Sequence, residues 1–234
     1  MRALAALALA LLPLPVWAPA WAQAYQCTPS GRITPPRPIV PDGPVRRTPI
    51  AGYTLAASWS PDYCKTSGDT ASLQCSGRNG RFGFVLHGLW PESASGPGPQ
   101  WCQSLQPSVP DLRANLCMTP SPDLLAHEWA KHGSCMARTP VQYFRAAAIL
   151  WRSLHWPDVD RLSRKDGLTV RDLREAFVAE NPAWRPDQVG VVLSRTGWLR
   201  EMRLCYSRRF LPVRCDRRRL GTPDATPLKI WRGL

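Results

Sequence analysis

Apolar residues recur along the chain in patterns that predict strands near both ends of the sequence and helices between them. Strand-length apolar runs bounded by Gly, Pro and polar clusters occur at 53–60, 82–89, 188–194 and 198–206, with a short candidate partner strand at 210–214. A proline directly after the first run is expected to stop that strand. Strands at both ends with helices in the middle predict an α+β domain with a mainly antiparallel central sheet and packed helices.

Three segments of the middle region predict helices, because each begins at a side chain that can cap a helix. The segments are 122–132, 139–154 and 169–180, and their capping residues are Ser121, Thr139 and Thr169. The first is expected to end at a glycine and the third at an Asn-Pro pair. Residues 92–110 are broken by Gly and Pro, so we expect a loop there.

Residues 1–24 have the pattern of a secretory signal peptide: one arginine, then the apolar run 3–16, then small residues at two candidate cleavage sites. A membrane anchor is the alternative, but the run contains two prolines and is shorter than the ~18 residues of a spanning helix. Residues 25–50 form a proline-rich lead-in, and 51–234 is long enough for one domain. We therefore expect an exported protein, periplasmic or extracellular, with no membrane span in its mature form.

The eight cysteines all follow the expected leader, and an even number in an exported chain predicts disulfides. A zinc site is less compatible, because no C-x-x-C pair is present. The formal net charge of +13 favours a polyanionic partner such as nucleic acid, although it would also serve solubility or attraction to anionic lipid. Nine arginines within 195–219 are either an RNA-binding surface or the solvated faces of strands and a tail.

Three of the four histidines lie in two short segments. His87 lies near the end of the predicted strand 82–89, where strict alternation places it on the same face as Leu89 and opposite Leu86 and Gly88. On the predicted helix 122–132, an arc of about 140° holds His127, Glu128, Lys131 and His132, with i, i+4 pairs of His127 with Lys131 and of Glu128 with His132. The fourth histidine, His155, is expected to be structural.

Three interpretations fit these ionisable groups. A solvated helix face with chance histidines is one. A zinc hydrolase is another, but the i, i+5 spacing of His127 and His132 turns the imidazoles about 140° apart, which is poor geometry for one ion. The third is RNA cleavage without a metal: one imidazole removes the ribose 2′-OH proton, a second protonates the leaving 5′-oxygen, and cations stabilise the phosphate.

Two motifs resemble those of the ribonuclease T2 family, the secreted acid endoribonucleases. F-V-L-H-G-L-W-P at 84–91 resembles the first active-site motif of the family, and H-E-W-A-K-H-G-S-C at 127–135 resembles the second. S-W-S-P-D-Y-C at 58–64 is similar to the first core strand and the cysteine after it. The serine before Cys135 departs from the threonine common there, and 112–126 does not align with the family's base pocket, so no base preference is implied.

The resemblance implies that 51–234 is a ribonuclease domain that needs no metal or cofactor, with single-stranded RNA as its partner. It implies cleavage to 2′,3′-cyclic phosphates followed by hydrolysis to 3′-phosphates, in a protein that we expect to be a monomer. The implied roles are His132 as general base, His87 as general acid, Glu128 and Lys131 as stabilisers of the pentacoordinate phosphate, and His127 and Trp90 as phosphate-binding residues. Trp90 could instead be a core residue. Trp101, in the Gly/Pro loop, is the best candidate for an exposed stacking surface.

The resemblance also implies disulfides. The pairs are Cys64–Cys75, Cys102–Cys135 and Cys205–Cys215, which leaves Cys27–Cys117. An inactive RNA-binding or surface-binding member of the same fold is the remaining alternative. The complete set of His87, Glu128, Lys131 and His132 argues against it.

Overall fold

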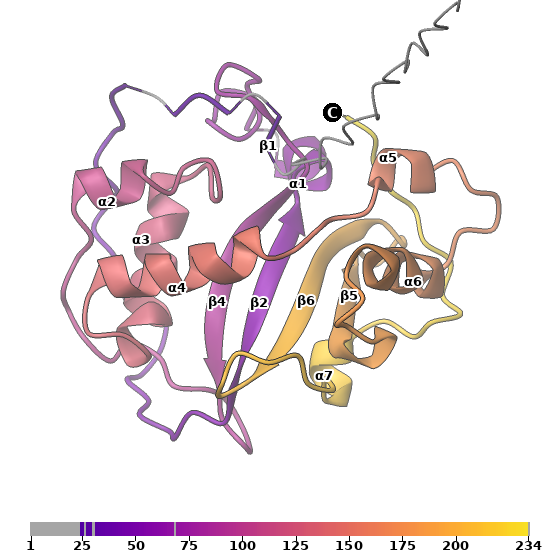
Figure 1. The fold of residues 1–234 in the computed structure, drawn as a ribbon. Coiled ribbons are helices and arrows are strands. Elements are labelled where there is room, and N and C mark those ends of the chain that lie inside the picture. Colours follow the sequence, from indigo (N-terminus) through magenta and orange to yellow (C-terminus); the bar gives the residue numbers. More distant parts are fainter. Residues whose placement is uncertain (1–23, 26, 30, 68, 234) are drawn as a thin grey trace, which may run out of the picture.

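The computed structural model describes residues 24–25, 27–29, 31–67 and 69–233, and the expected leader lies almost wholly outside them. At its centre is a four-stranded antiparallel sheet with the order β4-β2-β6-β5 (Figure 1). Its strands are β2 (Gly52–Trp59), β4 (Phe84–Glu92), β5 (Val189–Leu193) and β6 (Leu199–Ser207). A second, two-stranded sheet pairs β1 (Ala24–Tyr25) with β3 (Arg81–Phe82).

Helices connect and cover these strands. They are α1 (Ser60–Ser67), α2 (Val109–Arg113), α3 (Pro122–Lys131), α4 (Pro140–Arg152), α5 (Val159–Leu162), α6 (Val170–Glu180) and α7 (Arg217–Leu220), with 3-10 turns at Gly133–Cys135 and Pro186–Gln188. The three predicted helices are α3, α4 and α6. Each begins as expected, since the side chains of Ser121, Thr139 and Thr169 accept hydrogen bonds from the backbone of the first turn. The fold is α+β, as predicted.

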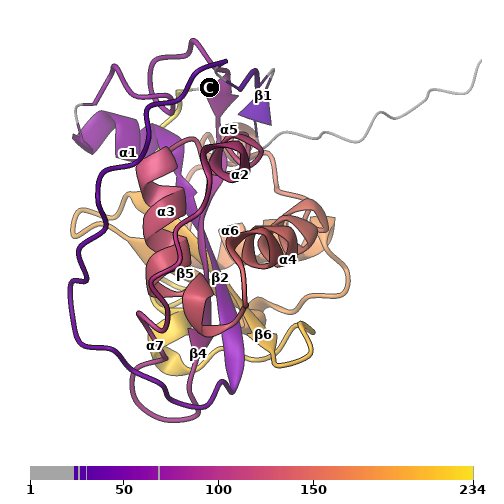
Figure 2. The same cartoon turned by 90° about the vertical axis from the view of Figure 1, so that its left-hand side faces the viewer.

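Helices α4 and α6 lie together on one side of the central strands (Figure 2), and the hydrophobic core fills the space between them and the sheet. Tyr143 of α4, Phe177 of α6 and Leu204 of β6 are fully buried members of this core. The Tyr143 hydroxyl also accepts a hydrogen bond of 3.1 Å from the Leu89 backbone, which ties α4 to β4. The opposite face of the sheet is therefore left for polar side chains.

Strand β2 ends just before Pro61, as predicted, but the helix α1 that follows was not predicted. Pro61 lies in the first turn of α1, where a missing N–H costs nothing. Two other predicted boundaries were wrong. Strand β4 continues through Pro91, which an edge strand tolerates. The expected loop 92–110 already gives way to α2 at Val109. The candidate strand 210–214 contributes only an isolated bridge to β6.

A β-bulge at His87 overturns the predicted faces of β4. Ala57 pairs with Leu86 and Ala56 with Gly88, so His87 is an extra residue without a partner across the strand pair. The alternation shifts by one residue there, and Leu89 joins Leu86 in the core while Gly88 turns to the other face. The side chain of His87 therefore lies at the bulge, on the face opposite the core residues Leu86 and Leu89.

Four disulfides join the eight cysteines, all of which lie in the described part of the chain: Cys27–Cys117, Cys64–Cys75, Cys102–Cys135 and Cys205–Cys215. These are the pairs that the resemblance implied. Cys102–Cys135 fastens the loop after β4 to the end of α3, and Cys27–Cys117 fastens the proline-rich lead-in. Within the described residues, no helix has both the length and the apolar character needed to cross a membrane.

Candidate active site

The two histidine motifs meet where the end of α3 packs against β4, on the sheet face away from α4 and α6. The indole of Trp90 contacts one histidine of each motif, with its ring centroid 5.2 Å from that of His87 and 5.7 Å from that of His132. Trp90 is only partly buried, which disfavours the core interpretation. The structure therefore gathers His87, Trp90 and His132 at one site.

His87 is surrounded by carboxylates. Its Nδ1 lies 2.8 Å from Glu201 Oε2 on β6 and 3.3 Å from Ser58 Oγ on β2, and its Nε2 lies 3.7 Å from Glu128 Oε1. Burial alone would lower the pKa of His87. The hydrogen bond to Glu201 and the charges of Glu128 and Glu201 outweigh burial, and the pKa is raised above its usual value.

Glu128 lies beneath His87 and Trp90, with only 5% of its side chain exposed. Its Oε2 accepts a 2.7 Å hydrogen bond from Trp90 Nε1. Burial raises the pKa of Glu128 to about 7, opposed by the charge of His87 and the hydrogen bond from Trp90. Gly88 makes this packing possible, since a Cβ there would overlap the Glu128 carboxylate and the Trp90 indole. The predicted pairing of Glu128 with His132 is replaced by contacts with His87 and Trp90.

His132 has the opposite surroundings. It is the C-cap of α3, where the chain leaves the helix, and its Nδ1 is buried without a hydrogen-bond partner among the described residues. Burial, then the positive charges of Lys131, His127 and His87, lower its pKa to about 3. His132 is therefore neutral near pH 7, whereas a raised pKa favours the charged form of His87.

The second helical pair, His127 and Lys131, faces the proline-rich lead-in. Lys131 Nζ lies 2.6 Å from Asp42 Oδ2 and 5.8 Å from the ring centroid of Trp101. The Trp101 ring meets His127 edge-on at 5.5 Å. Burial and the charge of Lys131 lower the pKa of His127. Trp101 is only 6% exposed, so the prediction of an exposed stacking surface was wrong: its loop folds back onto α3.

Comparison with known proteins shows the family of this chain. The model of the Ribonuclease T2 family matches residues 51–170, which is half of the chain and contains both histidine motifs. The chain belongs to the ribonuclease T2 family. This match confirms the resemblance that the motifs carried.

Relatives and solved structures agree with this membership. A "probable ribonuclease" of Haemophilus influenzae is 37% identical over an alignment of 134 residues that covers 51% of this chain and 48% of that protein. The chain thus matches about half the length of that relative. Trichomaglin, described as an S-like ribonuclease, superposes with a TM-score of 0.61 at 18% identity, covering 78% of this chain and 98% of its own. RNase NT, solved with 5′-AMP, gives a TM-score of 0.58 at 18% identity over 78% and 98% of the two chains. These two structures show the same fold.

Within this T2 fold, four residues that contact the site had no role predicted from the sequence, although one of them, Ser58, lies in the similar segment 58–64. They are Asp42 in the lead-in, Ser58 on β2, and Glu201 and Arg203 on β6. Glu201 and Arg203 lie outside the matched range 51–170. No local pattern marks Glu201, because its approach to His87 depends on the pairing of β6 with β2, more than a hundred residues away in sequence.

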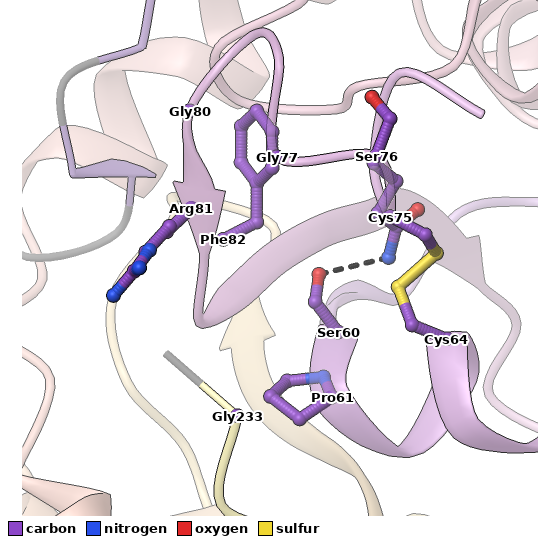
Figure 3. A pocket seen from close by; sticks show the side chains of 11 residues that line it. Ser60, Pro61, Cys64, Cys75, Ser76, Gly77, Gly80, Arg81, Phe82 and Gly233 are labelled. Carbon is purple, nitrogen blue, oxygen red and sulfur yellow. Dashed lines mark hydrogen bonds between the residues drawn. A yellow bond between two sulfur atoms is a disulfide. The ribbon is translucent and has the colours of Figure 1, made fainter. Parts of the chain in front are cut away.

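A hollow elsewhere on the T2 fold does not overlap this site. It has a volume of about 410 Å³ and lies between the start of α1, the Cys64–Cys75 disulfide and β3 (Figure 3). A hydrogen bond of 2.8 Å from Gln74 Nε2 to Ser60 Oγ crosses its wall. None of the histidine-motif residues line it. In the described part of the chain, no group of three His, Cys, Asp or Glu residues is arranged to hold a metal ion.

Proposed function

We propose that this chain is an endoribonuclease that cleaves single-stranded RNA by transphosphorylation, with His132 as general base and His87 as general acid. The observation that carries the proposal is the opposite charge environment of the two imidazoles on either side of Trp90. General acid–base catalysis needs one neutral and one protonated group at the same pH. The raised pKa of His87 and the pKa of His132 at about 3 supply that combination.

In the first step, His132 removes the proton of the 2′-hydroxyl, and the 2′-oxygen attacks the phosphorus. The bond from phosphorus to the 5′-oxygen breaks as His87 Nε2 gives its proton to that oxygen, which leaves a 2′,3′-cyclic phosphate. In the second step, His87 removes a proton from water, the hydroxide opens the ring, and His132 returns a proton to the 2′-oxygen. The product is a 3′-phosphate, and both histidines regain their starting states.

The remaining motif residues support the phosphate. Lys131 and His127 supply positive or hydrogen-bonding groups for the developing charge on the phosphorane oxygens, and the Trp90 ring, in contact with both His87 and His132, lines the phosphate site. A bound phosphate places negative charge next to His132, which raises its pKa from about 3 and makes it a stronger base. Glu128, with a pKa of about 7, fixes Trp90 and faces His87.

We also propose that the protein is exported, acts as a monomer on RNA, and uses neither a metal nor a cofactor. Four disulfides favour an oxidising compartment, either the periplasm or the medium. The family membership and the ribonuclease relatives support RNA as the substrate. The net charge of +13 supports a polyanionic substrate.

The deciding experiment is cleavage of single-stranded RNA by the purified mature protein in excess EDTA, beside the variants His132→Ala and His155→Ala. We expect the wild type to form 2′,3′-cyclic phosphates and His132→Ala to lose about 10² to 10⁴-fold in rate. His155 is exposed and outside the site, so His155→Ala is the matched control with wild-type activity.

Other outcomes point to other functions. Loss of cleavage in EDTA, restored by Zn²⁺, would indicate a zinc hydrolase. A folded wild type that binds RNA without cleaving it, with or without added metal, would indicate a binding protein on the ribonuclease fold.

A further inference from the structure

The contact between His87 and Glu201 determines which ring nitrogen of His87 is available for chemistry. An ionised carboxylate only accepts hydrogen bonds, so the 2.8 Å contact requires the proton on Nδ1 in both the neutral and the charged ring. Nε2 is then free to give or take a proton. His132 has no such partner on its Nδ1 among the described residues. The two histidines therefore differ in how firmly their rings are oriented.

Glu201 is itself held from two sides. Its Oε1 accepts a 2.8 Å hydrogen bond from Arg203 Nε, and only 10% of its side chain is exposed. Met202 and Leu204 of β6 lie in the core, so strand alternation puts Glu201 on the opposite, polar face, where it pairs with Ser58 of β2. Glu201 then faces the bulged His87 across β2, next to Ser58. The bulge at His87 and the regular register of β6 against β2 thus bring the pair together.

Glu201, more than Glu128, is suited to be the counter-ion of His87. Burial would raise the pKa of Glu201, but the hydrogen bond and charge of His87 and the charge of Arg203 lower it below its usual value. Glu128 instead has a pKa of about 7, and its nearest oxygen lies 3.7 Å from His87. Near neutral pH, Glu201 remains an anion while Glu128 takes up a proton in part of the molecules.

We infer that Glu201 is a positioning residue, which holds the ring of His87 with Nε2 toward the phosphate and keeps that ring protonated for its role as general acid. This inference rests on the proposed function, since the role of His87 belongs to it. Glu201 acts through His87 and is not expected to contact RNA. The charged or titratable groups that act on His87 are Glu201 and Arg203 from β6, with Glu128, His127 and His132 from α3 and its C-terminal end.

The test is to replace Glu201 by glutamine and read His87 directly. In Glu201→Gln the amide oxygen can still accept from Nδ1–H, but the negative charge is gone. We expect ¹⁵N NMR of the imidazoles to show the pKa of His87 lowered by about one unit or more. The alkaline limb of the kcat/KM profile should move to lower pH by the same amount. We expect kcat to fall about 10²-fold with KM nearly unchanged.

A second variant, Arg203→Gln, tests the same titration of His87 with an expected shift of opposite sign. Arg203 lowers the pKa of His87, so its removal should raise that pKa, opposite to Glu201→Gln. This variant also carries the test if Glu201→Gln fails to fold. Glu180→Gln, at the exposed end of α6, is the matched control and should change neither value.

Unchanged titration of His87 in Glu201→Gln, or shifts of the same sign in Glu201→Gln and Arg203→Gln, would overturn the inference. The NMR titration needs no turnover. A wild type that does not cleave RNA would therefore refute the proposed function, while the titration would still decide whether Glu201 governs His87.

Discussion

His87 and His132 carry the same side chain but lie in surroundings of opposite charge. His87 projects from a bulged strand between two carboxylates, Glu201 and Glu128, whereas His132 ends a helix beside Lys131. Carboxylates stabilise an imidazolium and neighbouring cations destabilise it, so the pKa of His87 is raised and that of His132 falls to about 3. The comparison teaches that the proposed assignment of His87 as acid and His132 as base follows from the neighbours of each ring.

The two environments also differ in origin. The carboxylate side is assembled from three strands and a helix that are distant in sequence, since Glu201 and His87 are 114 residues apart. The cationic side is largely local, because Lys131 and His132 are adjacent on α3. A short sequence motif can therefore contain the residues of the cationic side. The residues of the carboxylate side come together only when the whole sheet forms.

The largest expected effect comes from removing both rings. His87→Ala and His132→Ala should each lower kcat by about 10² to 10⁴-fold. Because both protons move in one reaction, the double variant should lose far less than the product of the two single losses. Single-turnover cleavage of a short RNA measures all three rates. Fully multiplicative losses would mean that the two histidines act independently, and would contradict the proposal that they act as an acid–base pair.

A smaller effect is expected from Lys131→Met, which changes the cationic side alone. The charge of Lys131 lowers the pKa of His132, so its removal raises that pKa from about 3 toward the ordinary value. The proposed mechanism requires neutral His132, so activity is expected to be lost below the pKa of His132, and the acid limb of the kcat/KM profile should move to higher pH. We also expect kcat/KM on the plateau to fall about tenfold or more, because a charge-assisted contact to phosphate is lost.

The pH profile of Lys131→Met separates these two effects. Lys165→Met is the matched control, since Lys165 pairs with Asp172 at the start of α6 and should leave the acid limb in place. An acid limb that stays fixed in Lys131→Met would show that Lys131 does not set the charge state of His132.

Much of the fold follows from local signals in the sequence. The capping residues Ser121, Thr139 and Thr169 mark helix starts because each satisfies a free backbone N–H within its own turn. The bulge at His87 was not predictable in this way, since it depends on how β4 registers against Ala56 and Ala57 of β2. The alternation rule therefore placed Leu89 on the wrong face.

The candidate site likewise contains residues that local motifs predict and residues that depend on long-range contacts. The motifs predict His87, Glu128, Lys131 and His132 as site residues. The structure brings His87, Glu128 and His132 into contact with Trp90, whereas Lys131 lies beside Asp42 and Trp101. Neighbours from other elements were missed, because nothing in the sequence near Glu201 or Asp42 indicates its partner. Trp101 was misplaced for a related reason. Its backbone N–H bonds to the Lys131 carbonyl, a long-range contact that buries a ring expected in an open loop.

The smallest expected effect concerns Asp42, an acidic neighbour on the cationic side. Asp42 is exposed and accepts a 2.6 Å hydrogen bond from Lys131, the group proposed to contact the phosphate. A phosphate that binds Lys131 must compete with this carboxylate, so Asp42→Asn should lower KM while kcat stays near its wild-type value. Exposed ion pairs contribute about 0.2 to 1 kcal/mol, so we expect a decrease in KM of up to about fivefold. The decrease should shrink at high salt, because the competition is electrostatic.

Steady-state cleavage at low and high salt, with Glu180→Gln as the control, measures this change in the KM of Asp42→Asn. An unchanged KM at low salt would mean that Lys131 reaches the phosphate without leaving Asp42, and that the carboxylate belongs to the working site.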